Sequence, residues 1–185
     1  MLKHYCRHCD KPLSNGILLD IHQANCLDLT KPKLVNLGKE RIQVFSLDDI
    51  SHLFDMDNII TRLFKHINLD SDRPRYHNII YTNSRSKNAL VFRTNKWIKV
   101  DVMQICEEVI DHKIRFLESF VKVHEIDNEN VRDQMKLLSN DVSARKSVNK
   151  QMRILLIAKK EMIKESMSLL TPPSVLVSSF VSTAI

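Results

Sequence analysis

The sequence contains few of the residues that make turns. Its 185 residues include 2 glycines and 5 prolines, whereas an all-β fold of this length needs many tight turns. Apolar residues make up 43% of the chain and charged residues 27%, a composition that favours amphipathic helices when turn residues are scarce. The composition therefore predicts an α+β protein in which helices dominate.

Cysteines and long apolar runs are also scarce. Of the 4 cysteines, three lie near the N-terminus at metal-ligand spacing, so we expect no disulfide framework. Cys106 stands alone in a helical pattern, where a buried thiol is an inert small hydrophobe. No run reaches the roughly 18 apolar residues of a transmembrane helix, and the first residues lack the apolar core of a secretory signal. We therefore expect a soluble intracellular protein without a membrane partner.

The N-terminal cysteines belong to a pattern of metal ligands. Cys6, Cys9, His22 and Cys26 have the spacing C-x2-C-x12-H-x3-C. A close cysteine pair directs two thiolates at one ion, and His22 and Cys26, four residues apart, face the same way on a helix. Residues 1–30 are therefore predicted to form a ββα-type zinc finger of the two-Cys-two-His lineage, with one structural Zn²⁺ as its cofactor.

Apolar residues of the finger support the same prediction. Leu13 and Leu19 stand at the offsets where this class of finger places its apolar plug, and Tyr5 adds a third wall. Asn15-Gly16 supplies the turn before the helix. Because four protein ligands leave no open coordination position, the zinc cannot activate a water molecule. The chain also offers no acid–base pair or phosphate-binding loop, so we expect no enzymatic activity and no small-molecule substrate.

The helix of the finger is poorly suited to reading DNA. Fingers that read DNA contact three successive bases through helix positions −1, 3 and 6, which fall here at Asn15, Leu18 and Ile21. Leucine and isoleucine cannot make the bidentate hydrogen bonds that discriminate bases, and one finger covers only about three base pairs. We therefore interpret Leu18 and Ile21 as an exposed patch that binds a partner protein.

A linker at 31–45 is expected to separate the finger from a helix–meander–helix domain at 46–126. The N-cap pattern at Ser46 and the apolar periodicity after it predict a helix at about 47–68. Asp101 can cap a second helix with one apolar stripe. Between these helices, three short apolar runs predict a small antiparallel meander, at residues 79–81, 89–92 and 97–100.

The strongest local charge excess lies near the C-terminal end. The chain has 28 basic and 22 acidic residues and a formal net charge of +6. Over most of the sequence the two kinds of residue are interspersed, as is usual for a solvated surface. Residues 127–167 differ, because a three–four apolar spacing coincides there with few acids, and we predict one long, basic, amphipathic helix with a coiled-coil-like seam. Its candidate polyanion-binding residues are Arg145, Lys146, Lys150 and Arg153.

The last segment, residues 168–185, is apolar and carries no charged side chain. A disordered terminus is normally polar and charged, and the Pro172-Pro173 pair stops a helix. We therefore expect an extended tail that adds a strand to a neighbour's sheet edge or packs back on its own domain. Its candidate partner-binding residues are Val175, Val177 and Phe180.

In their order along the chain, these features resemble the uncharacterised zinc-finger proteins of nucleocytoplasmic large DNA viruses. The resemblance rests on the finger, the linker and amphipathic helix, the run Tyr76-His77-Asn78-Ile79-Ile80-Tyr81-Thr82-Asn83, and the strand leading to Asn95-Lys96-Trp97. It spans roughly residues 5–120 and does not include the basic helix or the tail. It implies an intracellular viral protein that carries zinc ligands and no recognised active-site residues.

Two functions are compatible with this organisation. We expect a zinc-stabilised protein-interaction or assembly protein, most concretely a minor capsid or other structural component of a large DNA virus particle, whose partners are other viral structural proteins. The alternative is a nucleic-acid-associated viral regulatory protein that uses the finger and the basic helix for non-specific binding. The first function places the protein in the virion and, during assembly, in the host cell cytoplasm or viral factory.

Overall fold

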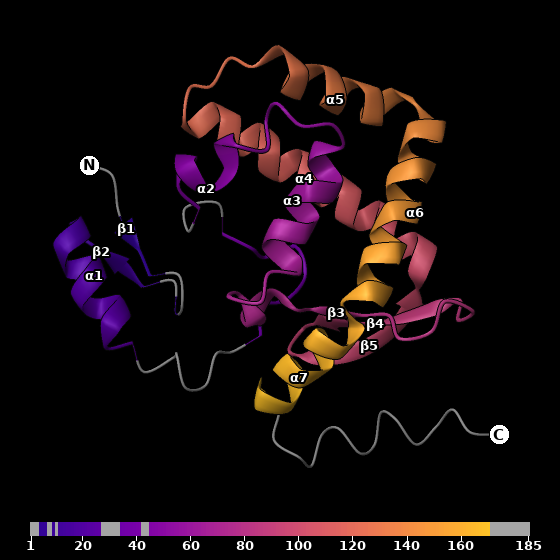
Figure 1. Ribbon diagram of the computed structural model, residues 1–185, viewed down its shortest axis with the longest axis horizontal. Coiled ribbons are helices and arrows are strands. Elements are labelled where there is room, and N and C mark those ends of the chain that lie inside the picture. The colour runs from indigo at the N-terminus through magenta and orange to yellow at the C-terminus, as the bar shows by residue number, and fades with distance from the viewer. Residues whose placement is uncertain (1–3, 7–8, 10, 27–33, 42–44, 171–185) are drawn as a thin grey trace.

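The computed structural model describes residues 4–6, 9, 11–26, 34–41 and 45–170. It contains a small N-terminal finger and a larger domain built mainly from helices (Figure 1). The predicted helix-dominated α+β fold is therefore confirmed. Of the predicted tail at 168–185, the first residues belong to a helix that ends at Leu170. The rest, including Val175, Val177 and Phe180, lies outside the described residues.

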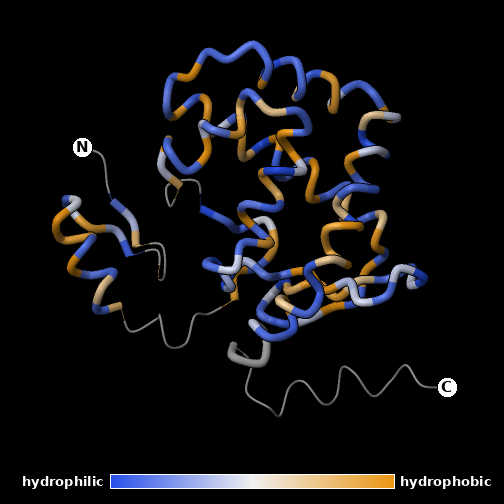
Figure 2. Tube along the Cα trace, viewed as in Figure 1, coloured by the Kyte–Doolittle hydropathy of each residue, from blue (hydrophilic) through white to orange (hydrophobic). Residues whose placement is uncertain are grey.

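The larger domain has a helical core with a small sheet at one end. Helices α3, α4 and α6 pack on one another, α5 lies across their other end, and α7 packs against β3 and η3 (Figure 1). Apolar residues gather where these elements face each other (Figure 2). In chain order the elements are α2 (Leu47–Ser51), α3 (Ile59–Asn68), the 3-10 helix η3 (Pro74–Tyr76), β3 (Ile79–Ile80), β4 (Asn88–Arg93), β5 (Lys96–Asp101), α4 (Val102–Val123), α5 (Glu129–Asn140), α6 (Val142–Ala158) and α7 (Lys160–Leu170).

Helix α4 places its predicted apolar stripe in the core. Asp101 caps the helix, because its Oδ1 accepts hydrogen bonds from the Met103 and Gln104 N–H groups at 2.8 and 3.1 Å. Cys106 is also buried, and burial raises the pKa of its thiol to about 12, so the thiol is protonated and unreactive, as predicted. The buried stripe residues are Val102, Ile105, Val109, Ile110, Ile114 and Leu117.

The predicted meander is confirmed as the antiparallel sheet β3-β4-β5. Strands β4 and β5 are joined by Thr94 and Asn95, whose φ angles of 48° and 59° are those of the two-residue turns that match strand twist. Phe92 and Trp97 face each other across this hairpin, with ring centroids 5.4 Å apart. Trp97 is half-buried, so it contributes to packing of the sheet on the domain.

The predicted helix at 47–68 is in fact two helices, α2 and α3, separated by a turn. Asn58 ends the turn in the left-handed conformation, with φ of 59°, which asparagine tolerates better than most residues. The Gln134 side chain on α5 stabilises the break, since it accepts a hydrogen bond from the Ile59 N–H and donates one to the Met56 carbonyl, both at 2.9 Å. Gln134 is distant in sequence, so local periodicity did not predict the break.

The predicted long helix at 127–167 is divided into α5, α6 and α7. Asp141 ends α5 in an extended conformation and caps α6, because its carboxylate accepts hydrogen bonds from two backbone N–H groups of the next turn at 2.7 and 3.2 Å. Val142, which is one of the residues on the predicted three–four spacing, does not join the seam, since it is 66% exposed. The seam residues that are buried are Val131, Leu138, Met152, Leu156 and Ile163.

Part of the predicted linker, residues 34–41, is packed into the larger domain. The Val35 N–H donates a hydrogen bond to the Arg75 carbonyl at 2.8 Å, and the Leu37 N–H donates one to the Phe92 carbonyl at 3.0 Å. The segment therefore runs beside η3 and β4 and does not act as a free connector. Linker composition did not predict this, because the partners of these backbone groups lie more than thirty residues away.

The same segment buries an acid next to a buried lysine. The Glu40 side chain is fully buried, and its Oε1 lies 2.9 Å from Asn68 Nδ2, 3.3 Å from Asn78 Nδ2 and 3.7 Å from Lys113 Nζ. His112 Nε2 lies 3.4 Å from the other carboxylate oxygen. These contacts connect residues 34–41 to α3, α4 and the turn before β3. Buried charges are stable only in such pairs, so the cluster holds the segment in place.

Glu40 should make the larger domain acid-sensitive between pH 4.5 and 2. Burial by itself would raise the pKa of Glu40, but Lys113, His112 and Asn68 stabilise the carboxylate and lower the pKa from 4.5 to about 2. The ionised carboxylate stabilises the folded domain at pH values above the pKa of the unfolded state. This stabilisation is lost as pH falls through the pKa of the folded state, and the free energy of unfolding then decreases by about 3 kcal/mol.

Urea unfolding at about pH 5 and about pH 2, followed by Trp97 fluorescence, measures this loss. The unfolding free energy of the Glu40→Gln variant should fall by about 3 kcal/mol less over this range than that of the wild type. If the unfolding free energy decreases equally in the two proteins between these pH values, the role assigned to Glu40 is wrong.

Candidate metal centre

Local structure places four ligand residues around one point. Cys6 and Cys9 lie in the turn between two short antiparallel strands, where the Cys6 N–H donates a hydrogen bond to the Lys11 carbonyl at 3.0 Å. His22 stands in the last turn of the following helix, and Cys26 comes directly after that helix's C-terminal cap. The elements of the finger are β1 (His4–Tyr5), β2 (Pro12–Leu13) and α1 (Gly16–Ala24).

The four ligand atoms lie close enough together to hold one metal ion. All of them lie within 4.8 Å of one another. The Sγ atoms of Cys6 and Cys26 are 3.8 Å apart, and Cys9 Sγ is 3.1 Å from His22 Nε2. A disulfide holds its sulfurs about 2.05 Å apart, whereas two thiolates about 2.3 Å from a tetrahedral ion are about 3.8 Å apart. In the part of the chain that the structure describes, no other group of His, Cys, Asp and Glu has this arrangement.

A cation at the cluster would change the protonation state of its thiols. Burial raises the pKa of Cys9 to about 12, and the neighbouring thiols of Cys26 and Cys6 add to this rise, while a backbone hydrogen bond at Lys11 opposes it. A bound metal ion supplies the positive charge that converts such thiols to thiolates. The chemistry of the donor set therefore fits a metal ion, and metal binding should release protons.

The apolar interior of the finger is small. Cys6 and Cys26 are 0% and 5% exposed, but Tyr5, Leu13 and Leu19 are only half-buried. The predicted apolar plug is thus partly exposed, and no residue of α1 is fully buried. A domain below about 40 residues rarely folds on its core alone, so a metal ion held by the four ligands would supply much of this finger's stability.

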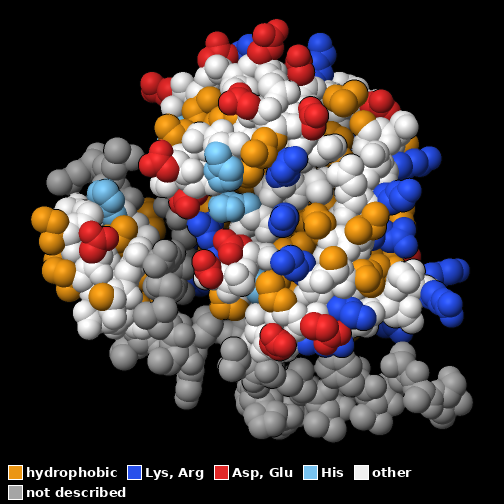
Figure 3. Space-filling model, viewed as in Figure 1, with side chains coloured by type: hydrophobic (Ala, Val, Ile, Leu, Met, Phe, Trp, Pro, Cys, Tyr) orange, Lys and Arg blue, Asp and Glu red, His pale blue; other side chains and the backbone are white. Residues whose placement is uncertain are grey.

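The outer face of α1 presents aliphatic side chains to solvent. Leu18 and Ile21 are 44% and 56% exposed, and Ile17, which was not predicted, is 73% exposed. These three residues form the aliphatic patch, and Figure 3 shows hydrophobic side chains along the outer side of the finger. Asn15 cannot make a bidentate contact with a base, because its Oδ1 accepts the hydrogen bond from the Leu18 N–H at 2.9 Å that caps α1.

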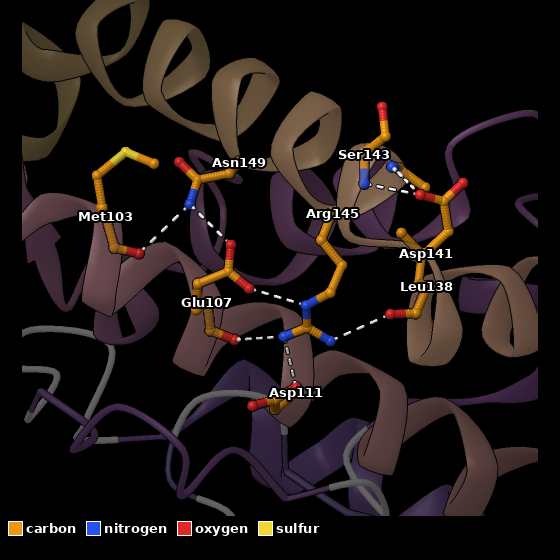
Figure 4. Close-up of polar contacts among 9 residues, drawn as sticks. Met103, Glu107, Asp111, Leu138, Asp141, Ser143, Arg145 and Asn149 are labelled. Carbon is orange, nitrogen blue, oxygen red and sulfur yellow. Dashed lines mark hydrogen bonds and ion pairs between the residues drawn. The ribbon is translucent and has the colours of Figure 1, made fainter.

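Arg145 differs from the other predicted polyanion-binding residues because acidic side chains neutralise it. Arg145 Nε lies 2.8 Å from Glu107 Oε2, its Nη2 lies 2.7 Å from Asp111 Oδ1, and its Nη1 donates to the Leu138 carbonyl at 3.2 Å (Figure 4). These contacts fasten the start of α6 to α4 and to the end of α5. Arg145 therefore links α6 to α4 and α5 within the domain, and its charge is neutralised. This is contrary to the prediction that Arg145 binds a polyanion.

The other three predicted residues are not neutralised in this way. Lys146 and Lys150 are exposed on α6. Arg153 lies against Tyr81, with its Nη2 3.4 Å from the Tyr81 hydroxyl oxygen and its guanidinium carbon 5.9 Å from the ring centroid. Polyanion binding by these residues remains a prediction.

The comparisons with known proteins add no family. No protein-family model matches the chain, and searches of curated proteins and of solved structures also find no match. The resemblance to viral zinc-finger proteins therefore remains a prediction. None of the helices in the described part of the chain combines the length and the apolar composition that a membrane span requires.

Proposed function

We propose that this protein is a non-catalytic, zinc-stabilised protein-interaction protein. Cys6, Cys9, His22 and Cys26 would hold one Zn²⁺, since three thiolates and an imidazole suit this ion and are typical of closed structural sites. Four protein ligands leave no open position for a water molecule or a substrate. The ion would then stabilise the finger, and α1 would present the surface that binds the partner.

The aliphatic patch is the observation that carries this proposal. Ile17, Leu18 and Ile21 place three branched aliphatic side chains on one solvent-exposed face of a short helix. Exposed apolar clusters of this kind mark protein-binding surfaces. Base reading is disfavoured, because Leu18 and Ile21 cannot form base-specific hydrogen bonds and Asn15 Oδ1, which a bidentate contact would need, is used in the helix cap.

In its concrete form, the proposal is a minor capsid or other structural component of a large DNA virus particle. This form rests on the resemblance described above and on the apolar segment at 171–185, which would act as a second anchoring segment. Its partners would be other viral structural proteins, and its location would be the virion or, during assembly, the viral factory.

Leu18→Asp combined with Ile21→Asp should reduce incorporation into purified particles about tenfold, because two charges would replace the apolar contacts of the interface. Incorporation is measured as protein copies per particle from infected cells. Asp20→Ser, at an exposed polar position of the same helix, should incorporate like the wild type. Unchanged incorporation of the double variant, or absence of the wild-type protein from particles, would contradict the proposal.

A second candidate function, sequence-independent association with nucleic acid, is favoured by the uncompensated basic side chains of α6. It does not require the finger, since phosphate contacts are made by positive charge alone. The two functions make separate predictions, because one concerns α1 and the other concerns α6.

A further inference from the structure

Folding brings the loop between β3 and β4 beside the C-terminal half of α6. Tyr81 is buried, and its hydroxyl oxygen lies 3.1 and 3.0 Å from the carbonyl oxygens of Ser84 and Ser86. Arg153 of α6 approaches the same hydroxyl at 3.4 Å. The loop is therefore held against α6 by one buried side chain. This contact joins two parts of the chain that are about seventy residues apart.

The loop adds two cations to those of α6. Arg85 and Lys87 are exposed on the loop, as Lys146 and Lys150 are on α6. On the helix, Lys146, Lys150 and Arg153 advance about 10 Å at 1.5 Å per residue, and Arg153 is the residue that meets the loop. We call these five residues the basic strip. Figure 3 shows Lys and Arg side chains along the edge of the domain where α6 and the sheet lie.

The acids of the described residues do not form ion pairs with the basic strip. Among the ion pairs of the described residues, none includes a member of the strip. Arg153 Nε is buried without a hydrogen-bond partner, whereas the neighbouring Arg145 is fully engaged by two acids. The strip therefore keeps a net positive charge.

The chemistry of the strip suits a row of phosphates on a double helix. Lysine and arginine bind phosphate as charged donors and read no sequence when they contact only the backbone. Proteins that hold single strands stack bases on exposed aromatic rings, and helices that insert into membranes carry Trp or Phe on their apolar face. Within the described residues, no Trp, Tyr or Phe is exposed. Stacking and membrane insertion are therefore disfavoured.

We propose that the basic strip binds the phosphate backbone of double-stranded nucleic acid without reading its sequence. Arg85 and Lys87 extend the contact from α6 onto the loop between β3 and β4, and Arg145 takes no part in it. The inference rests on the second candidate function and is independent of the aliphatic patch and of capsid incorporation.

The test measures binding of the full-length, zinc-loaded protein to a labelled DNA duplex of about twenty base pairs over a series of salt concentrations. Lys87→Ala combined with Lys150→Ala should weaken binding at least about tenfold and reduce the slope of log affinity against log salt by about 1.8, because each neutralised phosphate contributes about 0.9. Lys96→Ala combined with Lys122→Ala is the matched control, since both lysines are exposed and lie at the far ends of β5 and α4. The control should bind within about twofold of the wild type.

Several results would overturn the proposal. If the wild type does not bind the duplex, the second candidate function is itself wrong. If binding is tight but both double variants lose it equally, nucleic-acid binding is real and arises from diffuse charge, so the strip is not its site. Preference for one duplex sequence would show base reading. Binding to anionic phosphatidylserine vesicles without binding to the duplex would identify a lipid surface as the partner.

Discussion

Replacing Cys6 by serine should abolish zinc binding and unfold residues 4–26 while leaving the larger domain folded. Structural zinc contributes roughly 10 to 16 kcal/mol to isolated fingers. The half-buried Leu13 and Leu19 cannot replace a contribution of that size. Elemental analysis should find one zinc ion per chain in the wild type and none in the variant. Hydrogen exchange should show unprotected amides in the finger and unchanged protection in α4.

Cys106→Ser is the matched control for this experiment. It makes the same chemical change at a buried cysteine of α4 that is not part of the metal cluster. This control should keep one zinc ion per chain and a protected finger, although its larger domain becomes less stable. Zinc retained at full stoichiometry by the Cys6→Ser protein, or a wild-type protein that binds no zinc, would refute the assignment.

Replacing Lys113 by methionine should destabilise the larger domain by about 3 to 5 kcal/mol, because it leaves Glu40 buried without its positive partner. Both side chains are 0% exposed, and Lys113 Nζ lies 3.7 Å from Glu40 Oε1. The free energy of unfolding in urea, followed by Trp97 fluorescence, measures the change. Lys122→Met, an exposed position on the same helix, should change it by less than about 0.5 kcal/mol.

A double variant separates the loss of the charge pair from a simple packing defect. Glu40→Gln together with Lys113→Met removes both charges, and the glutamine Oε1 still accepts the hydrogen bond from Asn68. This double variant should be more stable than the Lys113→Met protein, since no buried charge remains uncompensated. If the effects of the two substitutions simply add, the two residues do not act as a pair.

Local sequence predicted those features whose physical causes lie within a few residues. The metal ligands were found because a chelating pattern needs cysteines and a histidine at fixed short spacings. The stripe of α4 and its cap at Asp101 follow from helical periodicity and from hydrogen bonds within one turn. The meander was found from short apolar runs separated by turn residues.

Three of the errors concern features that depend on distant partners. The turn between α2 and α3 is held by Gln134 of α5, and residues 34–41 are held by η3, β4 and the Glu40 cluster. Arg145 was predicted to be available because its sequence neighbours are basic, yet Glu107 and Asp111 from α4 neutralise it. The cap at Asp141 is local, but the apolar spacing continues from Leu138 to Val142 across it, so periodicity alone does not reveal the break between α5 and α6.

By itself, the sequence determined the helix-dominated class, the metal ligands and the exposed aliphatic positions Leu18 and Ile21, since periodicity and ligand spacing are properties of neighbouring residues. Only the tertiary structure decided which charges are neutralised. It buried Glu40 against Lys113, paired Arg145 with acids, and left Arg153 beside a loop that carries two further cations. The reason is physical, because the strength of a charge interaction depends on distance and burial, which folding sets between residues far apart in the chain.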